Sequence, residues 1–98
     1  MAKMYDILNS ATKKKIGVDI RHNTILFFFD KTVLAKQSLT EEKVNEREHW
    51  IAETYKDNTI ISTFAGTKED VAQKCIAHAI KVKEDIEKAK KYGINKPY

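Results

Sequence analysis

Residues 67–92 read TKEDVAQKCIAHAIKVKEDIEKAKKY and contain the clearest structural signal in the chain. Apolar residues recur here at intervals of three and four, which lines them up on one side of a helix: Ala72, Cys75, Ile76, Ala79, Val82 and Ile86. Thr67 is a suitable N-cap, and Gly93 followed by Pro97 is typical of a helix end. The pattern predicts a helix from about Lys68 to Tyr92.

Before this helix the hydrophobic period changes to two, which indicates strands. Residues 16–21 alternate between apolar and polar, and His22-Asn23 is suited to a tight turn. Residues 24–29, TILFFF, carry no charge and predict a central strand covered on both faces. Residues 32–35 predict a third, shorter strand.

Residues 38–55 support two interpretations. Ser38 and Glu41 have the spacing of a capping box, which favours a helix. Residues 50–55 are instead rich in strand formers, and the turn at 56–58 connects them to a segment of matched length, residues 59–64. We favour the hairpin on the strength of that matched length.

Together these elements predict an α+β fold, with residues 1–98 forming a single domain. We expect a small antiparallel, meander-like sheet of four to five strands, packed by one long C-terminal helix. Residues 5–11 include enough apolar side chains for a short N-terminal helical segment that packs against the sheet.

The composition fits a globular protein, with 42% hydrophobic and 33% charged residues among 98. A single cysteine excludes a disulfide within the chain and favours a reducing compartment. The first residues lack the apolar run of a signal peptide, and no stretch approaches the ~20 apolar residues of a membrane span. We therefore expect a cytoplasmic protein that does not act at a membrane.

The net charge of +4 is unevenly distributed, because residues 38–70 carry −4 while the segments on either side carry +4 each. Lysine predominates over arginine, which argues against sequence-specific base reading and leaves non-specific attraction to phosphates. A spacing of seven places three lysines on the helix face opposite the apolar stripe. The candidate nucleic-acid or acidic-partner ridge consists of Lys74, Lys81, Lys88, Lys13, Lys14 and Lys15.

Signals for catalysis are weak. The three histidines lie far apart and lack zinc-binding spacing, and the three glycines do not form a phosphate loop. Asp19, Asp30 and Glu53 are candidate magnesium ligands across a sheet, although acids at strand ends are ordinarily solvated. Cys75 has His78 nearby on the same helix but lies in the apolar stripe, where burial makes a thiol inert. We expect no metal, no cofactor and no enzymatic activity.

The aromatic residues suggest a binding surface. Because residues 27–29 are consecutive phenylalanines, at least one must point to the sheet face that a single long helix leaves uncovered. An uncovered apolar face needs a partner, which is an N-terminal helix, a second subunit or another protein. The predicted partner-binding residues on the sheet are Phe27, Phe28, Phe29, Trp50 and Tyr55.

Residues 50–82 contain a predicted hairpin, the turn at 56–58, and Lys68, Val71 and Ala72 opening an apolar helix. This third of the chain resembles the hairpin-plus-helix half of a double-stranded RNA-binding domain and the arm-type DNA-binding domains of phage integrases. The RNA-binding family has a lysine cluster where Glu69 and Asp70 follow Lys68 here. The nucleic-acid-facing strands of both families are neutral or basic, whereas residues 41–53 are acidic. We interpret the resemblance as shared β-β-α geometry.

The leading functional hypothesis is a small non-enzymatic binding protein that occupies a protein partner, itself or both. Small lysine-rich proteins are common in phages and bacterial mobile elements, so a host-directed inhibitor or regulator is one form of this hypothesis. The first alternative is a non-specific nucleic-acid-binding protein that uses the lysine ridge. A further alternative is a protein that sequesters a small ligand.

Overall fold

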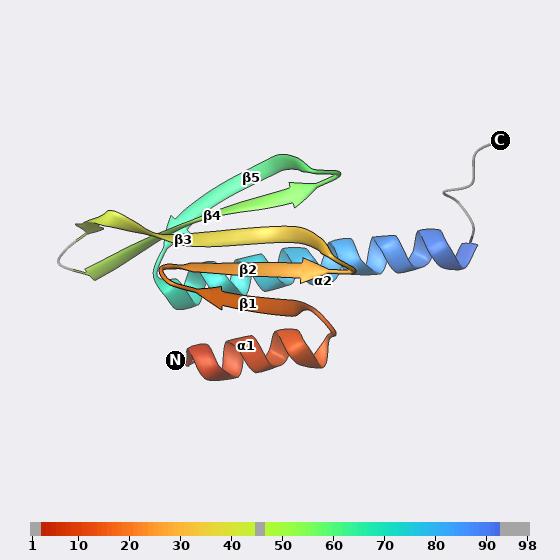
Figure 1. The fold of residues 1–98 in the computed structure, drawn as a ribbon, viewed down its shortest axis with the longest axis horizontal. Coiled ribbons are helices and arrows are strands. Elements are labelled where there is room, and N and C mark those ends of the chain that lie inside the picture. The colour runs from red at the N-terminus through yellow and green to blue at the C-terminus, as the bar shows by residue number, and fades with distance from the viewer. Residues whose placement is uncertain (1–2, 45–46, 93–98) are drawn as a thin grey trace.

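The computed structural model describes residues 3–44 and 47–92, which form two helices and one five-stranded sheet. Figure 1 shows the strands side by side in chain order, β1-β2-β3-β4-β5, each antiparallel to its neighbour. The elements are α1 (Met4–Lys13), β1 (Gly17–Arg21), β2 (Thr24–Phe29), β3 (Thr32–Val44), β4 (Arg47–Lys56), β5 (Thr59–Gly66) and α2 (Lys68–Tyr92). The predicted α+β fold with an antiparallel meander and a long C-terminal helix is confirmed.

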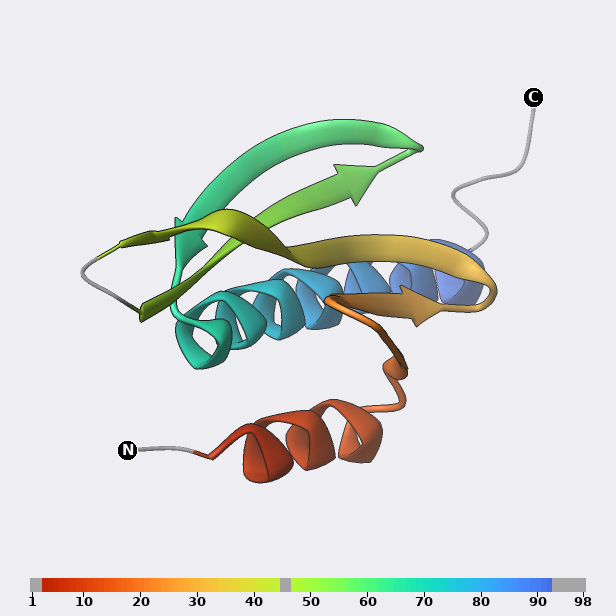
Figure 2. The ribbon, with the colours of Figure 1, turned by 60° about the vertical axis from the view of Figure 1, so that its left-hand side comes forward.

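Both helices lie on the same side of the sheet. Helix α2 crosses beneath β2, β3 and β4, and α1 packs beside it against α2 and β1 (Figures 1 and 2). The buried core between the layers includes Ile7 and Ala11 of α1, Phe27 and Trp50 of the sheet, and Cys75 of α2, and partly buried residues of β1 and β5 pack against it. The sheet therefore has one covered face and one face without a helix in the described chain.

The C-terminal helix begins where the sequence predicts. The backbone amide of Asp70 donates to Oγ1 of Thr67 at 3.2 Å, which is the expected N-cap bond. Gln37, fully buried on β3, donates from Nε2 to the backbone oxygen of Lys68 at 3.3 Å and ties the first turn of α2 to the sheet. Gly93 and Pro97, the predicted end signals, lie outside the described residues.

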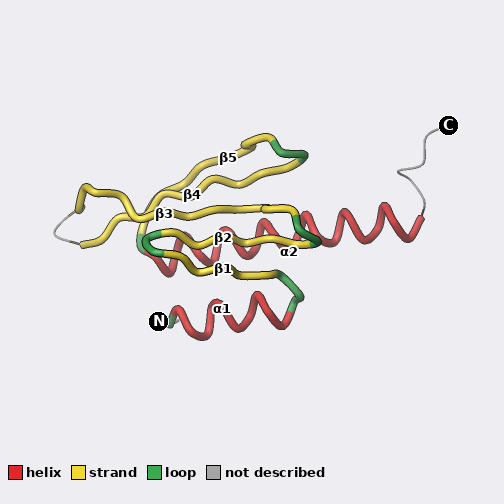
Figure 3. Tube along the Cα trace, viewed as in Figure 1, coloured by secondary structure: helices red, strands yellow, loops and turns green. Residues whose placement is uncertain are grey.

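Tight turns connect β1 to β2, β2 to β3 and β4 to β5, as the short loops in Figure 3 show. Asp30 and Lys31 have φ values of 52° and 67°, and Asp57 and Asn58 have 53° and 63°. Two consecutive left-handed residues are what a type I′ hairpin turn requires, and this turn matches the twist of the flanking strands. Asn23 also has a positive φ in the predicted 22–23 turn.

Two expectations about the strands need correction. Strand β3 spans Thr32–Val44 and is the longest in the sheet, whereas a short strand over 32–35 was predicted. Strand β2 was expected to be covered on both faces, but helices cover only one of its faces, because both helices lie on the same side of the sheet. The alternative interpretation of 38–55 as a helix is wrong and the favoured hairpin is confirmed, because residues 38–44 lie in β3 and residues 47–55 in β4.

The predicted N-terminal helical segment is present as α1, which extends over ten residues. It packs against α2 as well as the sheet, with Ile7 and Ala11 buried between the two helices and β1. None of the described helices is both long enough and apolar enough to cross a membrane.

Candidate functional site

The sheet face that points away from α2 is the main candidate site. Alternation along the strands sends every second residue to this side, and the paired positions in neighbouring strands bring apolar side chains together. We call this set the open face: Leu26, Phe28, Val33, Ile51, Tyr55 and Ile60. Val33 is 37% exposed, Ile51 43% and Ile60 49%, which is high for large apolar side chains.

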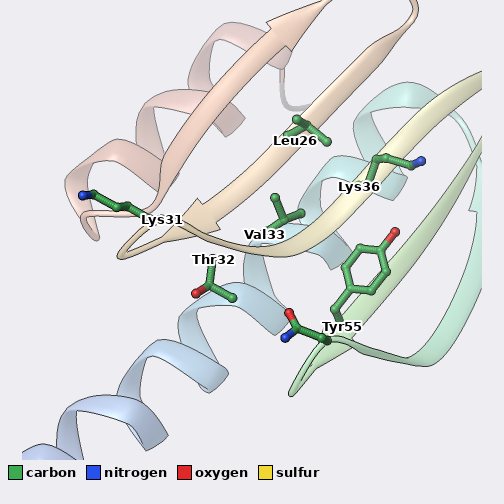
Figure 4. A pocket seen from close by; sticks show the side chains of 7 residues that line it. Leu26, Lys31, Thr32, Val33, Lys36 and Tyr55 are labelled. Carbon is green, nitrogen blue, oxygen red and sulfur yellow. The ribbon is translucent and has the colours of Figure 1, made fainter.

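The open face contains a shallow, open hollow of about 440 Å³ near the turns that join β2 to β3 and β4 to β5. Figure 4 shows Leu26, Val33 and Tyr55 around it, projecting from three neighbouring strands. Lys31 and Lys36 lie at its edge with Thr32 and Asn58. The hollow therefore combines apolar residues with two lysines in its lining.

The acidic groups of this face are already engaged. Oε1 of Glu53 accepts a hydrogen bond of 3.0 Å from the hydroxyl of Tyr55. Asp19 pairs with Arg21, its Oδ2 lying 2.9 Å from Nε. Within the described chain neither Lys31 nor Lys36 forms an ion pair, although Lys36 stands opposite Glu53 in the strand register. The two lysines are therefore the cations available to a partner.

The environment of Tyr55 keeps its hydroxyl protonated. Partial burial raises the pKa of Tyr55 above its ordinary value, and both the hydrogen bond to Glu53 and the negative charge of that carboxylate add to the rise. The phenol therefore acts as a hydrogen-bond donor at neutral pH. Because Glu53 accepts that bond, the pair presents a fixed polar group beside the apolar hollow.

The structure divides the five predicted partner-binding residues between the two sides of the sheet. Phe28 and Tyr55 lie on the open face. Phe27 and Trp50, which are 0% and 4% exposed, are core residues beneath the sheet. Phe29 also packs against that core, and Nζ of Lys83 lies 5.7 Å from its ring centroid. Alternation is the physical reason, since β2 turns Ile25 and Phe27 toward α2 and thereby turns Leu26 and Phe28 away.

Sequence reasoning missed several members of the open face. The sequence places four of them in strands but does not say which face of the sheet each one points to: Leu26, Val33, Ile51 and Ile60. The alternation of side chains along the strand could have identified them. If Phe27 points into the core, residues two positions away also point into the core, and the residues between them point to the open face. Lys36 was missed because only cross-strand register brings it beside Tyr55 and Leu26.

The predicted lysine ridge is exposed but interleaved with acids. Lys74, Lys81 and Lys88 lie on exposed positions of α2, and Nζ of Lys74 lies 5.6 Å from the ring centroid of Phe64. Helical spacing places three exposed acids beside them: Asp70, Glu84 and Asp85. Lys13, Lys14 and Lys15 are exposed at the end of α1, also on the helical side of the molecule. The ridge thus has alternating charge.

The other candidate chemistry residues are held in structural roles. Cys75 is fully buried, and burial raises the pKa of its thiol to about 12. Nε2 of His78 lies 3.0 Å from the backbone oxygen of Tyr55 and links α2 to β4. Within residues 3–44 and 47–92, no three His, Cys, Asp or Glu residues come together as a metal-binding group.

Comparisons of the chain with protein families, with curated proteins and with solved structures each give no match. The β-β-α order expected from the resemblance to nucleic-acid-binding domains is present as β4, β5 and α2. The likeness is therefore limited to the order of these elements, because no protein family matches the chain. Function is therefore inferred from the geometry of the open face.

Proposed function

We propose that this protein is a small non-enzymatic binding protein that acts by occupying a protein partner through the open face. In this role it would inhibit or regulate the partner by covering part of its surface. The observation that carries the proposal is the placement of both helices on one side of the sheet, which leaves Val33, Ile51 and Ile60 exposed on the other. Clustered exposed apolar residues with a polar rim are typical of protein-binding surfaces.

The charges of the open face define the chemistry of the partner. An apolar side chain of the partner would enter the hollow over Leu26 and Val33, and a nearby carboxylate would approach Lys31 or Lys36. Charges at the edge of an interface mainly accelerate association and select the orientation, while the apolar centre provides most of the affinity. We infer a partner surface that is apolar in the middle and acidic at its edge.

Protein binding is favoured over the two alternatives. A small ligand usually needs a pocket that buries most of its surface, whereas this hollow is shallow and open. Phosphate backbones bind best to continuous positive charge, and the lysine ridge is interrupted by Glu84 and Asp85. The open face also carries Lys36 and Glu53, but its apolar residues stay together. The register pairs Phe28 with Val33 and Tyr55 with Ile60, and Val33 and Tyr55 line the same hollow.

The test uses one charged substitution in the hollow and a matched one on the helical side. Proteins that co-purify with the chain from its native cells are identified, and the affinity of the purified partner is measured by calorimetry. We expect Val33→Glu to weaken binding at least tenfold, while Tyr5→Glu, at a 75% exposed site on α1, has no effect. Circular dichroism confirms that both variants fold.

Equal binding by wild type and Val33→Glu would contradict the proposal. A gel shift with nucleic acid that weakens steeply with salt and disappears on changing Lys74, Lys81 and Lys88 to glutamine would support the ridge instead. Val33 lies on the open face and the lysine ridge lies on the helical side, so the two variants distinguish protein binding from nucleic-acid binding.

A further inference from the structure

Strand β5 forms one edge of the sheet, and its outer side is not paired with any described strand. The strand is Thr59–Gly66, and Figure 1 shows it at the edge opposite α1. A row of backbone amide and carbonyl groups is therefore open to another strand along this edge. Such edges are templates for pairing with a further chain unless a protein protects them.

The usual protective features are missing from most of β5. Its sequence, TIISTFAG, contains no charged residue and no proline, in a chain of which 33% is charged. Ile60 and Ile61 are about half exposed on it. A bulge at Ile61 interrupts the pairing with β4, because Thr54 pairs with Ser62 while Tyr55 pairs with Ile60. The regular stretch available for a new strand is therefore Ser62–Gly66.

The opposite edge of the sheet is protected. Strand β1 has only five residues, carries the Asp19–Arg21 ion pair, and has α1 packed against it. A β5 strand from another molecule would meet charges and a helix there. Edge pairing between copies is therefore restricted to β5 with β5, which closes as a dimer, whereas β5 with β1 would continue into a filament.

We propose that two copies of this chain dimerise by antiparallel pairing of β5 with β5 around a two-fold axis near Phe64, which forms one ten-stranded sheet. An uncharged strand is complementary to itself in this arrangement, since no like charges are brought together in any register. A two-fold axis perpendicular to the sheet places both open faces on the same side. The dimer uses backbone groups of β5 and is independent of partner binding through the hollow.

The interface is small, so we expect a concentration-dependent dimer with a dissociation constant in the micromolar range. Sedimentation equilibrium of the full chain from about 10 μM to about 1 mM measures it. Ala65→Lys adds an ammonium group to each copy close to the axis and is expected to raise the dissociation constant at least tenfold. Ile20→Lys, at a 63% exposed site on β1, is the matched control and leaves it unchanged.

A second variant tests the geometry without adding charge. Thr63→Cys is expected to cross-link between copies through a short bismaleimide, whereas Ile20→Cys is not, because the two β1 strands lie at opposite ends of the dimer. Cys75 is fully buried and does not compete in the native protein. Thr63 stands opposite Glu53 on an exposed strand, so its replacement preserves the core.

A wild-type chain that stays monomeric to 1 mM would overturn the proposal, as would a dimer that Ile20→Cys cross-links as readily as Thr63→Cys. A dimer unaffected by Ala65→Lys would also overturn it. Failure of Val33→Glu to weaken partner binding contradicts the proposed function alone, because that substitution lies on the open face and away from the β5 edge.

Discussion

The ring of Phe28 lies directly over Gly17, its cross-strand partner on β1. The two residues are paired in the register, and a Cβ atom on residue 17 would stand 2.5 Å from two carbons of the ring. No real Cβ tolerates that separation, so glycine is what allows the aromatic ring to lie flat on the edge of the sheet. The position of the Phe28 ring on the open face therefore depends on the absence of a side chain at Gly17.

Replacing Gly17 with alanine should displace the Phe28 ring. The obstructed atoms are the far end of a side chain on the open side of the sheet, so the ring can move at a cost of about 1 kcal/mol in the free energy of unfolding. We expect partner affinity to fall several-fold, with a change in the aromatic NMR shifts of Phe28. The double variant Gly17→Ala, Phe28→Leu should recover stability, and simple additivity of the two changes would contradict the contact.

Replacing Lys31 with glycine should separate stability from binding. Lys31 has a φ of 67°, a left-handed conformation that glycine adopts without the cost paid by other residues. We expect Lys31→Gly to raise the free energy of unfolding by up to about 1 kcal/mol in urea denaturation, yet to weaken partner binding by removing a cation from the hollow.

The matched control for this prediction is Lys15→Gly. Lys15 has a φ of 65° but lies in the turn after α1, away from the open face. It should give a similar gain in stability and leave affinity unchanged. A loss of affinity in both variants would indicate a general effect of net charge instead of a role for Lys31.

Removing the N-cap of α2 should destabilise the whole fold. Thr67→Ala eliminates the acceptor for the Asp70 amide and should lower the free energy of unfolding by about 1 kcal/mol. Thr67→Ser retains the oxygen and should stay within a few tenths of wild type. Thermal denaturation of the three proteins makes the comparison, and equal losses in both variants would show that the hydroxyl contributes nothing.

Stability should fall at alkaline pH. Burial raises the pKa of Cys75 from 9.0 to about 12, and the pKa of Tyr55 is also raised, so the folded chain holds these protons more tightly than the unfolded chain. Their contribution is fully present below the unfolded pKa values and is lost as the pH rises through the folded ones, a window of about 9 to 12 for Cys75. Cys75→Ala should flatten this decline in urea denaturation at several pH values, and an unchanged slope would contradict the assignment.

Elements that one local pattern determines could be predicted from the sequence, whereas elements whose extent depends on matching two distant segments could not. The stripe from Ala72 to Ile86 and the cap at Thr67 define α2 without information from the rest of the chain. The length of β3 is instead set by pairing with β2 at one end and β4 at the other, which no local window contains. The burial of Gln37 could not be predicted for the same reason. Its side chain is polar, but it is fully buried in the structure, where its Nε2 donates to the backbone oxygen of Lys68 in α2.

The site was predicted less well than the fold, for a reason visible in β2. Three consecutive phenylalanines guarantee that both faces receive an aromatic ring, but their identity does not say which ring goes where. The placement of Ile25 and Phe27 under α2 decides it, and the bulge beside Phe27 adds a residue to β3 at Leu34. Bulges change the facing of every later residue, and they leave little trace in composition.

The order of the strands has a consequence for the newly synthesised chain. Each strand pairs with the one made just before it, so the meander can assemble progressively during translation with little loss of loop entropy. Helix α2, which covers one face of the sheet, is synthesised after all five strands. Until about residue 82 has left the ribosome, Phe27 and Trp50 remain on the solvent side of an unfinished layer. Transient chaperone contact is therefore expected to be concentrated in that interval of synthesis.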